Sequence, residues 1–404
     1  MNIKALLKSL LLRKFTTGLL ILQLSITLGL LINSAILALD TNNKLAQETG
    51  LDIENTLIIS LRPTSGEYRN LDYYRSIVSE DLHQLSKLSG VEGVSVMNQL
   101  PINKNGMLGN FYDLDDPEII RKDKYLRDVK FFISNENLGN TLALALLEGR
   151  YLTKDDQLDF GRNEPGNVVI TNSLKKALYG DDSALGQETN NGRIVGVVKD
   201  IMLDPTIPVN KQYGVFDNRA MEFVFTSRFY LLRVTPGQVE AVRNKVSDTI
   251  LAVQAERDIY RIITMAEHMK RFYSHDKGLA QLFLLLCGLM IFVTAISSYA
   301  YSQFHISRQK KYIGIRRALG ARKKDILLYV LTENWLVYSI GCTLGLVMAL
   351  GFNILLSQYI SLSKPDIMLF ILASVVIFVA GTIATLIPAI KTSNIPPVIA
   401  TRTV

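Results

Sequence analysis

Residues 278–304 read GLAQLFLLLCGLMIFVTAISSYAYSQF and carry no charged side chain. An α-helix rises about 1.5 Å per residue, so about 20 apolar residues cross a hydrocarbon core roughly 30 Å thick. This run is therefore long enough to span a membrane as a helix. Three further runs meet the same criterion, at residues 15–39, 335–356 and 367–390. The sequence predicts four transmembrane helices.

The first apolar run, residues 15–39, has a second interpretation as a signal peptide. Its apolar core is far longer than the usual signal-peptide core of about 7 to 15 residues, and no A-x-A-like cleavage site closes it. We therefore favour a membrane span over a cleaved leader.

Between the first two runs, residues 40–277 have the charge-rich composition of a water-soluble domain, although the whole chain of 404 residues is 48% hydrophobic. β-rich segments alternate there with helical ones, which favours an α/β fold. Strands are predicted at residues 56–61, 93–97, 129–134, 168–171, 193–198, 229–234 and 259–264, and helices at 72–88, 173–179 and 239–256. Residues 103–124 are predicted to form a surface loop. A helix over residues 266–277 is predicted to continue without a break into the second span.

The basic residues predict the orientation, because Lys and Arg resist translocation across the membrane. They gather in residues 1–14, 305–334 and 391–404, whereas the connection 357–366 holds only Lys364. All three basic segments lie on one side if both termini are cytoplasmic, which places residues 40–277 and 357–366 outside. The net charge of +7 thus reflects contact with membrane lipid, and no nucleic-acid partner is predicted.

No catalytic, cofactor or metal site is predicted. The sequence holds no G-x-x-x-x-G-K-[ST] phosphate loop and no G-x-S-x-G motif, so any ATP must be bound by another chain. Its four histidines lack metal-ligand spacing, and both cysteines lie within apolar runs. These observations favour a mechanical role over a catalytic one.

Small residues recur four positions apart in two of the spans, as Ser25 with Gly29 and Gly341 with Gly345. Such spacing lets helix backbones approach closely in lipid. The contact can lie within one bundle or across a dimer, and we favour the first.

The segment between the second and third spans, residues 308–334, reads RQKKYIGIRRALGARKKDILLYVLTEN. Basic and apolar residues alternate over residues 311–319, as in a short amphipathic helix at the bilayer surface. Gly320 is a natural helix stop, and a new helix is predicted to begin near Ala321. The alternative is a positively charged membrane anchor without a partner protein.

Glu333 and Asn334 lie where this new helix enters the membrane. An ionisable residue at such depth is a candidate functional site. The alternative, which we favour, places Glu333 in the headgroup zone, either solvated or paired with an Arg or Lys of the loop.

Residues 312–321, YIGIRRALGA, resemble the E-I-G-I-R-R-A-L-G-A signature of MacB/FtsX-like ABC permeases. Residues 88–94, LSGVEGV, and 194–200, IVGVVKD, are similar to landmarks of the family's periplasmic core domain. Pro388, Ala389, Pro397, Ala400 and Arg402 are similar to its closing motif. The resemblance covers nearly the whole chain.

The resemblance implies a transmembrane subunit of an ABC-type exporter in the cell inner membrane, with a MacB-like periplasmic core domain at residues 40–277. A separate ATP-binding subunit would dock on the loop 305–334, and ATP-driven motion would pass through the spans to that domain. The coupling residues carried over from the signature are Ile313, Gly314, Ile315, Arg316, Arg317, Ala318, Leu319, Gly320 and Ala321.

The resemblance further implies a dimer with a second copy or a paralogue. Such machines engage a periplasmic adaptor and an outer-membrane channel, and they export antibiotic, peptide, toxin or lipoprotein cargo. Two departures stand out: Tyr312 replaces the usual acidic residue of the signature, and the chain carries no fused ATPase, so that its ATPase is expected in trans. The alternative function is that of FtsX-like signal transmitters, which activate cell-wall hydrolases, although a domain of more than 200 residues is large for that role.

Overall fold

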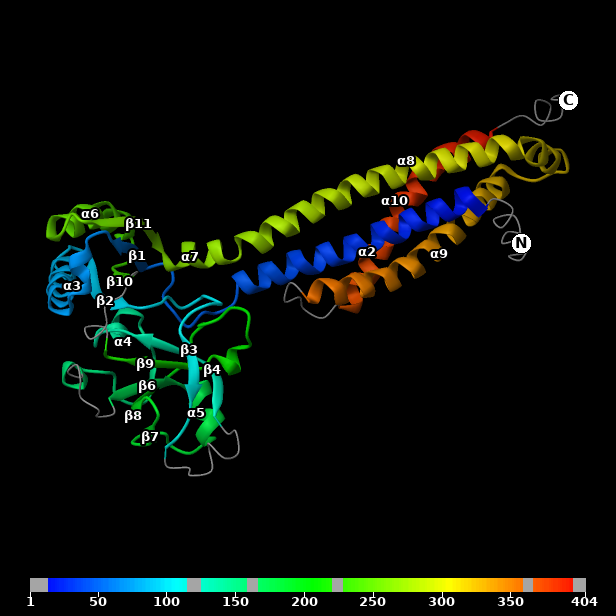
Figure 1. The fold of residues 1–404 in the computed structure, drawn as a ribbon. Coiled ribbons are helices and arrows are strands. Elements are labelled where there is room, and N and C mark those ends of the chain that lie inside the picture. Colours follow the sequence, from blue (N-terminus) through cyan, green and yellow to red (C-terminus); the bar gives the residue numbers. More distant parts are fainter. Residues whose placement is uncertain (1–13, 115–124, 158–165, 220–227, 359–365, 395–404) are drawn as a thin grey trace. The chain divides into compact units, whose positions relative to one another are not determined.

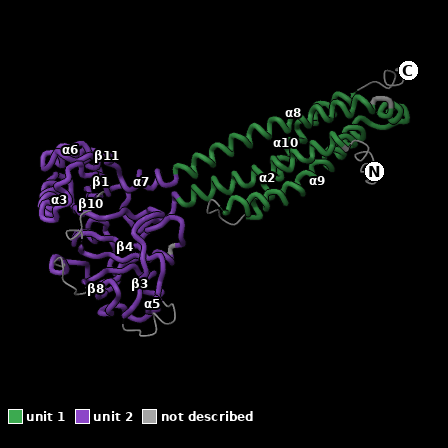
Figure 2. Tube along the Cα trace, viewed as in Figure 1, with its two compact units in different colours: residues 1–44, 274–404 green, residues 45–273 purple. Residues whose placement is uncertain are grey.

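The structure is a computed structural model, and it describes residues 14–114, 125–157, 166–219, 228–358 and 366–394. Three segments discussed above lie largely outside these ranges. They are residues 1–13 of the N-terminal segment, 359–365 of the connection between the last two spans, and 395–404 of the tail. The chain forms two compact units, which Figure 2 distinguishes by colour. The helical unit comprises residues 1–44 and 274–404, and the α/β unit comprises residues 45–273.

Long helices make up the described part of the helical unit (Figure 1). They are α2 (Lys14–Leu45), α8 (Ser274–Ala318), α9 (Lys323–Ser357) and α10 (Ile367–Ser393). Each is long and apolar enough to cross a membrane, which confirms the four predicted apolar helices. Large apolar side chains such as Leu285 and Phe292 face outward from α8, as expected for a surface that lipid covers.

The helices extend beyond the apolar runs of the sequence. α8 is the clearest case, because it continues past residue 304 to Ala318. Helix formation depends on local backbone geometry rather than on hydrophobicity alone, and residues 305–318 contain no glycine or proline other than Gly314. A charged flank therefore continues the helix that the apolar run begins.

One sheet of the α/β unit has four antiparallel strands in the order β11-β1-β10-β2. The strands are β1 (Thr56–Pro63), β2 (Val91–Met97), β10 (Arg228–Val234) and β11 (Arg257–Thr264). Alternate residues of a strand point to opposite faces. Leu57 and Ile59 accordingly pack with α3 (Leu71–Ser86) and α6 (Val239–Val253), whereas Ile58 faces the other side.

The second sheet is mixed, in the order β3-β4-β9-β6-β8-β5 with β7 on β8. Ile58 and Leu231 of the first sheet share one hydrophobic core with Phe132 and Phe216 of the second. The rings of Phe132 and Phe216 are stacked, with their centres 5.2 Å apart. The strands are β3 (Leu108–Phe111), β4 (Leu126–Ile133), β5 (Leu146–Gly149), β6 (Asn167–Thr171), β7 (Glu188–Thr189), β8 (Gly192–Val198) and β9 (Gly214–Asp217). The remaining elements are α4 (Leu138–Thr141), α5 (Asn172–Tyr179), α7 (Met265–Phe272), η1 (Gly66–Arg69), η2 (Lys154–Asp156) and η3 (Val209–Lys211).

Two expectations within this unit need correction. β3 lies inside the predicted surface loop 103–124, where its pairing with β4 replaces irregular structure. The expected unbroken helix over residues 266–277 is interrupted, because α7 ends at Phe272 and α8 begins at Ser274. Tyr273, between them, is buried in the core of the α/β unit.

Candidate functional site

The loop that carries the signature begins as the end of α8 rather than as a separate helix. α8 is unbroken to Ala318, so the short independent surface helix expected over residues 311–319 is not formed. Gly320 then adopts φ +100°, a conformation that favours glycine, while the Ala321 N–H donates to the Arg316 carbonyl at 3.0 Å. α9 starts at Lys323. We refer to residues 312–322 as the elbow.

The nine coupling residues taken from the signature differ in exposure. Ile313 and Gly314 are buried against the bundle. Ile315 is exposed, and Leu319 is 83% exposed at the helix end. Ile315 and Leu319 are thus the large apolar side chains of the signature that the elbow leaves exposed. The outward part of the signature is thus Ile315, Arg316, Ala318, Leu319 and Gly320.

Tyr312 takes part in the elbow through Arg316 rather than through an acidic group. The Arg316 guanidinium lies 4.7 Å from the centre of the Tyr312 ring and donates to the Tyr312 hydroxyl at 2.7 Å. The same guanidinium lies 4.8 Å from the Tyr329 ring of α9. Cation–π contacts on two sides therefore join the end of α8 to the first turns of α9. The spacing of Tyr312 and Arg316, four residues apart on one helix, was the available sequence signal for half of this arrangement.

A buried polar pair joins the same two helices deeper in the bundle. His305 Nε2 of α8 lies 2.5 Å from Glu333 Oε2 of α9, and Glu333 is 1% exposed. Glu333 is therefore enclosed by helices rather than solvated. Asn334, also buried, donates from Nδ2 to the Val330 carbonyl at 2.9 Å. The sequence marked Glu333 and Asn334 but not His305, which is 28 residues away from its partner.

The four small residues expected to pack helices meet between α2 and α9 of one chain. Ser25 Oγ donates to the Gly341 carbonyl at 3.1 Å. A Cβ atom on Gly345 would lie 2.9 Å from Leu28 Cβ, and one on Gly29 would lie 3.3 Å from the Phe352 ring. The row continues one turn further, since Asn33 Nδ2 donates to the Ala349 carbonyl at 3.0 Å. The spacing of residues 25, 29 and 33 could have revealed Asn33.

A second face of α2 carries polar contacts to α8 that the sequence analysis missed. Thr294 Oγ1 accepts from Gln23 Nε2 at 3.2 Å and lies 3.3 Å from Thr27 Oγ1. Ser34 Oγ lies 3.3 Å from Cys287 Sγ. Polar residues at 23, 27 and 34 of an otherwise apolar helix share one face, which was the signal for this contact.

These features connect helices; they do not assemble a reactive centre. Among the described residues, no group of three or more His, Cys, Asp or Glu side chains could hold a metal ion. The end of α8 carries exposed apolar side chains. Arg316 and the His305–Glu333 pair connect α8 to α9. α9 in turn packs closely on α2. The contacts of α8 therefore continue through α9 to α2.

Comparison with protein families identifies two matched regions. Residues 19–253, more than half of the chain, match the family model described as MacB-like periplasmic core domain. Residues 284–397 match the model described as FtsX-like permease C-terminal. The second match contains the whole elbow.

Similar curated proteins carry the name macrolide export ATP-binding/permease protein MacB. That of Chromobacterium violaceum is 25% identical over 63% of this chain and 40% of its own length. That of Wolinella succinogenes is 22% identical over 93% of this chain and 57% of its own length. The chain thus spans between about two fifths and three fifths of the length of these relatives.

A solved structure, the periplasmic region of MacB from Actinobacillus actinomycetemcomitans, aligns at 18% identity and a TM-score of 0.36, over 56% of this chain and 94% of that one. The two family matches decide the classification, since together they cover both the α/β unit and the helices that follow it. The chain belongs to the MacB/FtsX-like permeases of the ABC transporter family, membrane proteins with a periplasmic domain between the first two of four apolar helices.

Proposed function

We propose that this chain is the permease subunit of an ABC-type exporter and that a separate ATP-binding subunit docks on its elbow. The observation that carries this proposal is the end of α8, where Leu319 is 83% exposed beside Ile315. A large apolar side chain held open at a helix end is costly in water and gains stability when a partner covers it.

The contacts of the elbow support transmission of motion. A push at Leu319 acts on α8, and the Arg316 contact with Tyr329 passes it to α9. The His305–Glu333 pair provides a second link between the two helices. Because the bundle is tightly packed at Gly341 and Gly345, α2 follows α9. α2 and α8 are the two helices that lead into the periplasmic domain in sequence.

The remaining assignments of the proposal concern place and partners. The distribution of Lys and Arg supports an inner-membrane location with both termini cytoplasmic. We further propose assembly with a second copy or a paralogue, and export in cooperation with a periplasmic adaptor and an outer-membrane channel. The names of the relatives refer to macrolide export; for this chain we propose efflux of antibiotic, peptide or lipoprotein-like cargo.

The test is a pair of substitutions at the elbow, Ile315→Asp together with Leu319→Asp. Two charges on the apolar contact should reduce the ATP hydrolase activity that purifies with the tagged chain from its native cells by about tenfold or more. The measurement is ATP hydrolysis per mole of chain, with identification of a P-loop ATPase by mass spectrometry.

The matched control places the same charges on exposed leucines of the periplasmic domain, Leu185→Asp with Leu251→Asp. The control chain should keep its ATPase. Equal ATPase recovery from the elbow variant and the wild type, at equal thermal stability, would refute docking at the elbow.

A further inference from the structure

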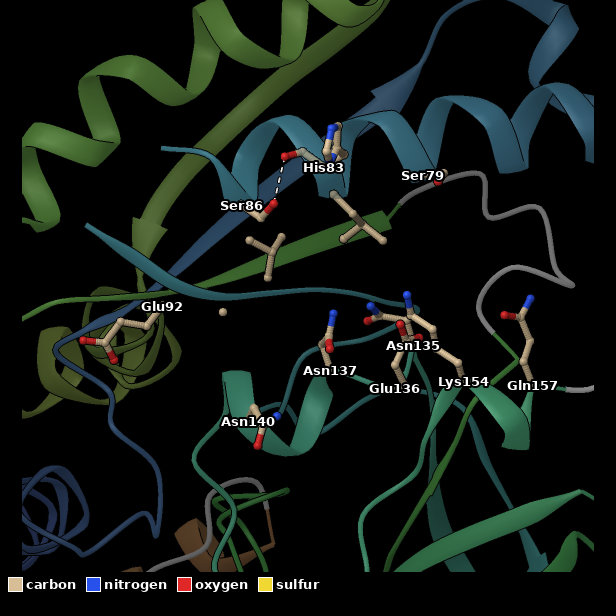
Figure 3. A pocket seen from close by; sticks show the side chains of 13 residues that line it. Ser79, His83, Ser86, Glu92, Asn135, Glu136, Asn137, Asn140, Lys154 and Gln157 are labelled. Carbon is tan, nitrogen blue, oxygen red and sulfur yellow. Dashed lines mark hydrogen bonds between the residues drawn. The ribbon is translucent and has the colours of Figure 1, made fainter. Parts of the chain in front are cut away.

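The α/β unit contains an open groove of about 580 Å³ (Figure 3). One side is formed by α3, which contributes Ser79 and His83, and the opposite side by the segment of α4 and η2. β2 runs along the floor with Val94. The groove lies far along the chain from the elbow and involves none of its residues.

β2 is an edge strand, since β10 is its only neighbour in the order of the first sheet. The chain itself covers part of the free edge. The Asn98 N–H donates to the Ile133 carbonyl at 3.1 Å, and the Val96 N–H donates to Asn135 Oδ1 at 3.1 Å. Ser134 Oγ donates to the Val96 carbonyl at 2.9 Å. The chain then leaves the edge and turns into α4.

The next free position on this edge is Val94. In an antiparallel pair, residues whose main-chain groups face the partner strand alternate with residues whose groups face away. The main-chain N–H and C=O of Val96 face away from β10, because they bond Asn135 and Ser134 instead. The main-chain groups of Val94, two residues earlier, therefore face away from β10 as well. Val94 lies opposite Leu232 in the register of the two strands. The Val94 N–H and C=O therefore point to the groove, and the described residues provide neither with a hydrogen-bond partner. A free edge of this kind accepts an added strand.

The walls carry carboxamides that make no side-chain hydrogen bond to the described residues. Asn137 precedes α4 without capping it, and the side chains of Asn140 and Gln157 are likewise uncommitted. Each carboxamide presents a donor and an acceptor, which is the hydrogen-bonding complement of a peptide group. Three of them around a free strand edge match the main chain of an extended peptide.

The lining disfavours other ligand classes. It contains no phenylalanine, tyrosine or tryptophan among the described residues, so a base or sugar ring finds no stacking platform. Leu82 and Val94 are its larger apolar residues, too few for an apolar drug-like molecule. Glu92 Oε2 forms an ion pair with Arg233 Nε at 3.2 Å, so its charge is compensated. The other two charged residues of the lining, Glu136 and Lys154, have opposite signs. The described lining therefore has no net charge that would favour an anion or a cation.

We propose that this groove binds a short peptide in extended conformation, which pairs with Val94 as an added strand and is held by the carboxamides of the walls. Recognition through the main chain tolerates varied side chains. This site goes beyond the coupling role and can be tested without any ATPase.

The experiment titrates the full chain in lipid nanodiscs with a fluorescein-labelled short peptide of alternating serine and threonine, followed by fluorescence anisotropy. We expect saturable binding. The same peptide with N-methyl groups on alternate main-chain nitrogens should bind at least roughly tenfold more weakly, because strand pairing is blocked. The double variant Asn137→Leu with Asn140→Leu should weaken the parent peptide by a similar factor.

The matched control is Asn105→Leu, an exposed carboxamide outside the groove, which should bind as the wild type does. Equal thermal stability of the variants shows that the fold is retained. Equal affinity for the N-methylated peptide, unchanged binding by the double variant, or no saturable binding up to about 1 mM would each overturn the proposal.

Discussion

Asp81 shows how one residue organises the periplasmic domain. Its carboxylate contacts the Arg257 guanidinium, with Nη1 at 2.5 Å and Nη2 at 2.8 Å, and accepts from the Tyr230 hydroxyl at 2.6 Å. Both charged side chains are fully buried. Such a pair offsets the cost of burial only while all its hydrogen bonds are made. It ties α3 to β10 and β11 across the sheet.

Replacing Asp81 should therefore be costly. Asp81→Asn leaves the Arg257 charge buried without its counter-ion, which should lower the free energy of unfolding by about 3–5 kcal/mol. The measurement is chemical denaturation of the full chain in detergent, followed by the circular dichroism of its sheets. Asp72→Asn, at an exposed carboxylate of the same helix, should cost less than about 1 kcal/mol. Similar losses in both variants would contradict this account.

His268 gives the periplasmic domain a predicted pH dependence. Burial lowers the pKa of His268, although contacts with the carbonyls of Pro101 and Ile102 oppose the shift. Because the pKa of His268 is lower in the folded chain than in the unfolded chain, the unfolded chain takes up more protons once the pH falls below about 6.5. The contribution of neutral His268 to the free energy of unfolding is therefore fully present above that pH. It is lost as the pH falls through the lowered pKa of the folded state.

The thermal midpoint should accordingly decrease between pH 7 and pH 5.5 in the wild type. His268→Gln should show a smaller decrease, because the titrating group is gone. A decrease of equal size in the His268 variant would assign the pH dependence to other groups.

At the scale of elements, the contact between α2 and α9 depends on glycine. Lipid provides no hydrophobic drive for two apolar helices to associate, so close packing and interhelical hydrogen bonds must hold them together. Gly341 and Gly345 allow this approach, and Ser25 and Asn33 each bond a carbonyl of α9.

Gly345→Ala should open this contact. The added Cβ would lie 2.9 Å from Leu28 Cβ and 3.1 Å from the Ser25 carbonyl, so the helices must separate at a cost of about 1–3 kcal/mol. The loss can be followed on heating by the reaction of Cys287 and Cys342 with a thiol dye. Gly351→Ala, in the same helix with no atom within 4 Å, should melt at or above the wild-type temperature. A Gly345 variant as stable as that control would show that the contact is loose.

At the scale of the whole molecule, the charge pattern predicts which parts face the cytoplasm. Basic residues flank the helices at the N-terminus, at the elbow and after α10. In the sequence between α9 and α10, Lys364 is the single basic residue. This asymmetry orients a chain during insertion because positive segments resist translocation.

Labelling can test the orientation with Cys287 and Cys342 replaced by serine. A membrane-impermeant maleimide should label Lys245→Cys, on the exposed side of α6, in intact spheroplasts. Lys323→Cys, at the start of α9, should react only after the membrane is opened. Labelling of the elbow position in intact spheroplasts would reverse the proposed topology and remove the docking site from the reach of cytoplasmic ATP.

The sequence by itself determined the features that depend on neighbouring residues. Apolar runs of sufficient length specified the four helices, short β-rich apolar runs specified β1 and β10, and Gly320 specified the stop after α8, since each signal is local. The short strands β5, β7 and β9 were missed, because a strand of two to four residues carries too little pattern and is held by its neighbours in the sheet.

Only the tertiary structure decided which distant groups meet. It paired His305 with Glu333, brought Tyr329 onto Arg316, and left Val94 at an open edge after covering Val96. It also joined the signature segment to α8 as one helix. These outcomes depend on the packing of segments far apart in the chain, and neither composition nor periodicity records which face of one element will lie against another.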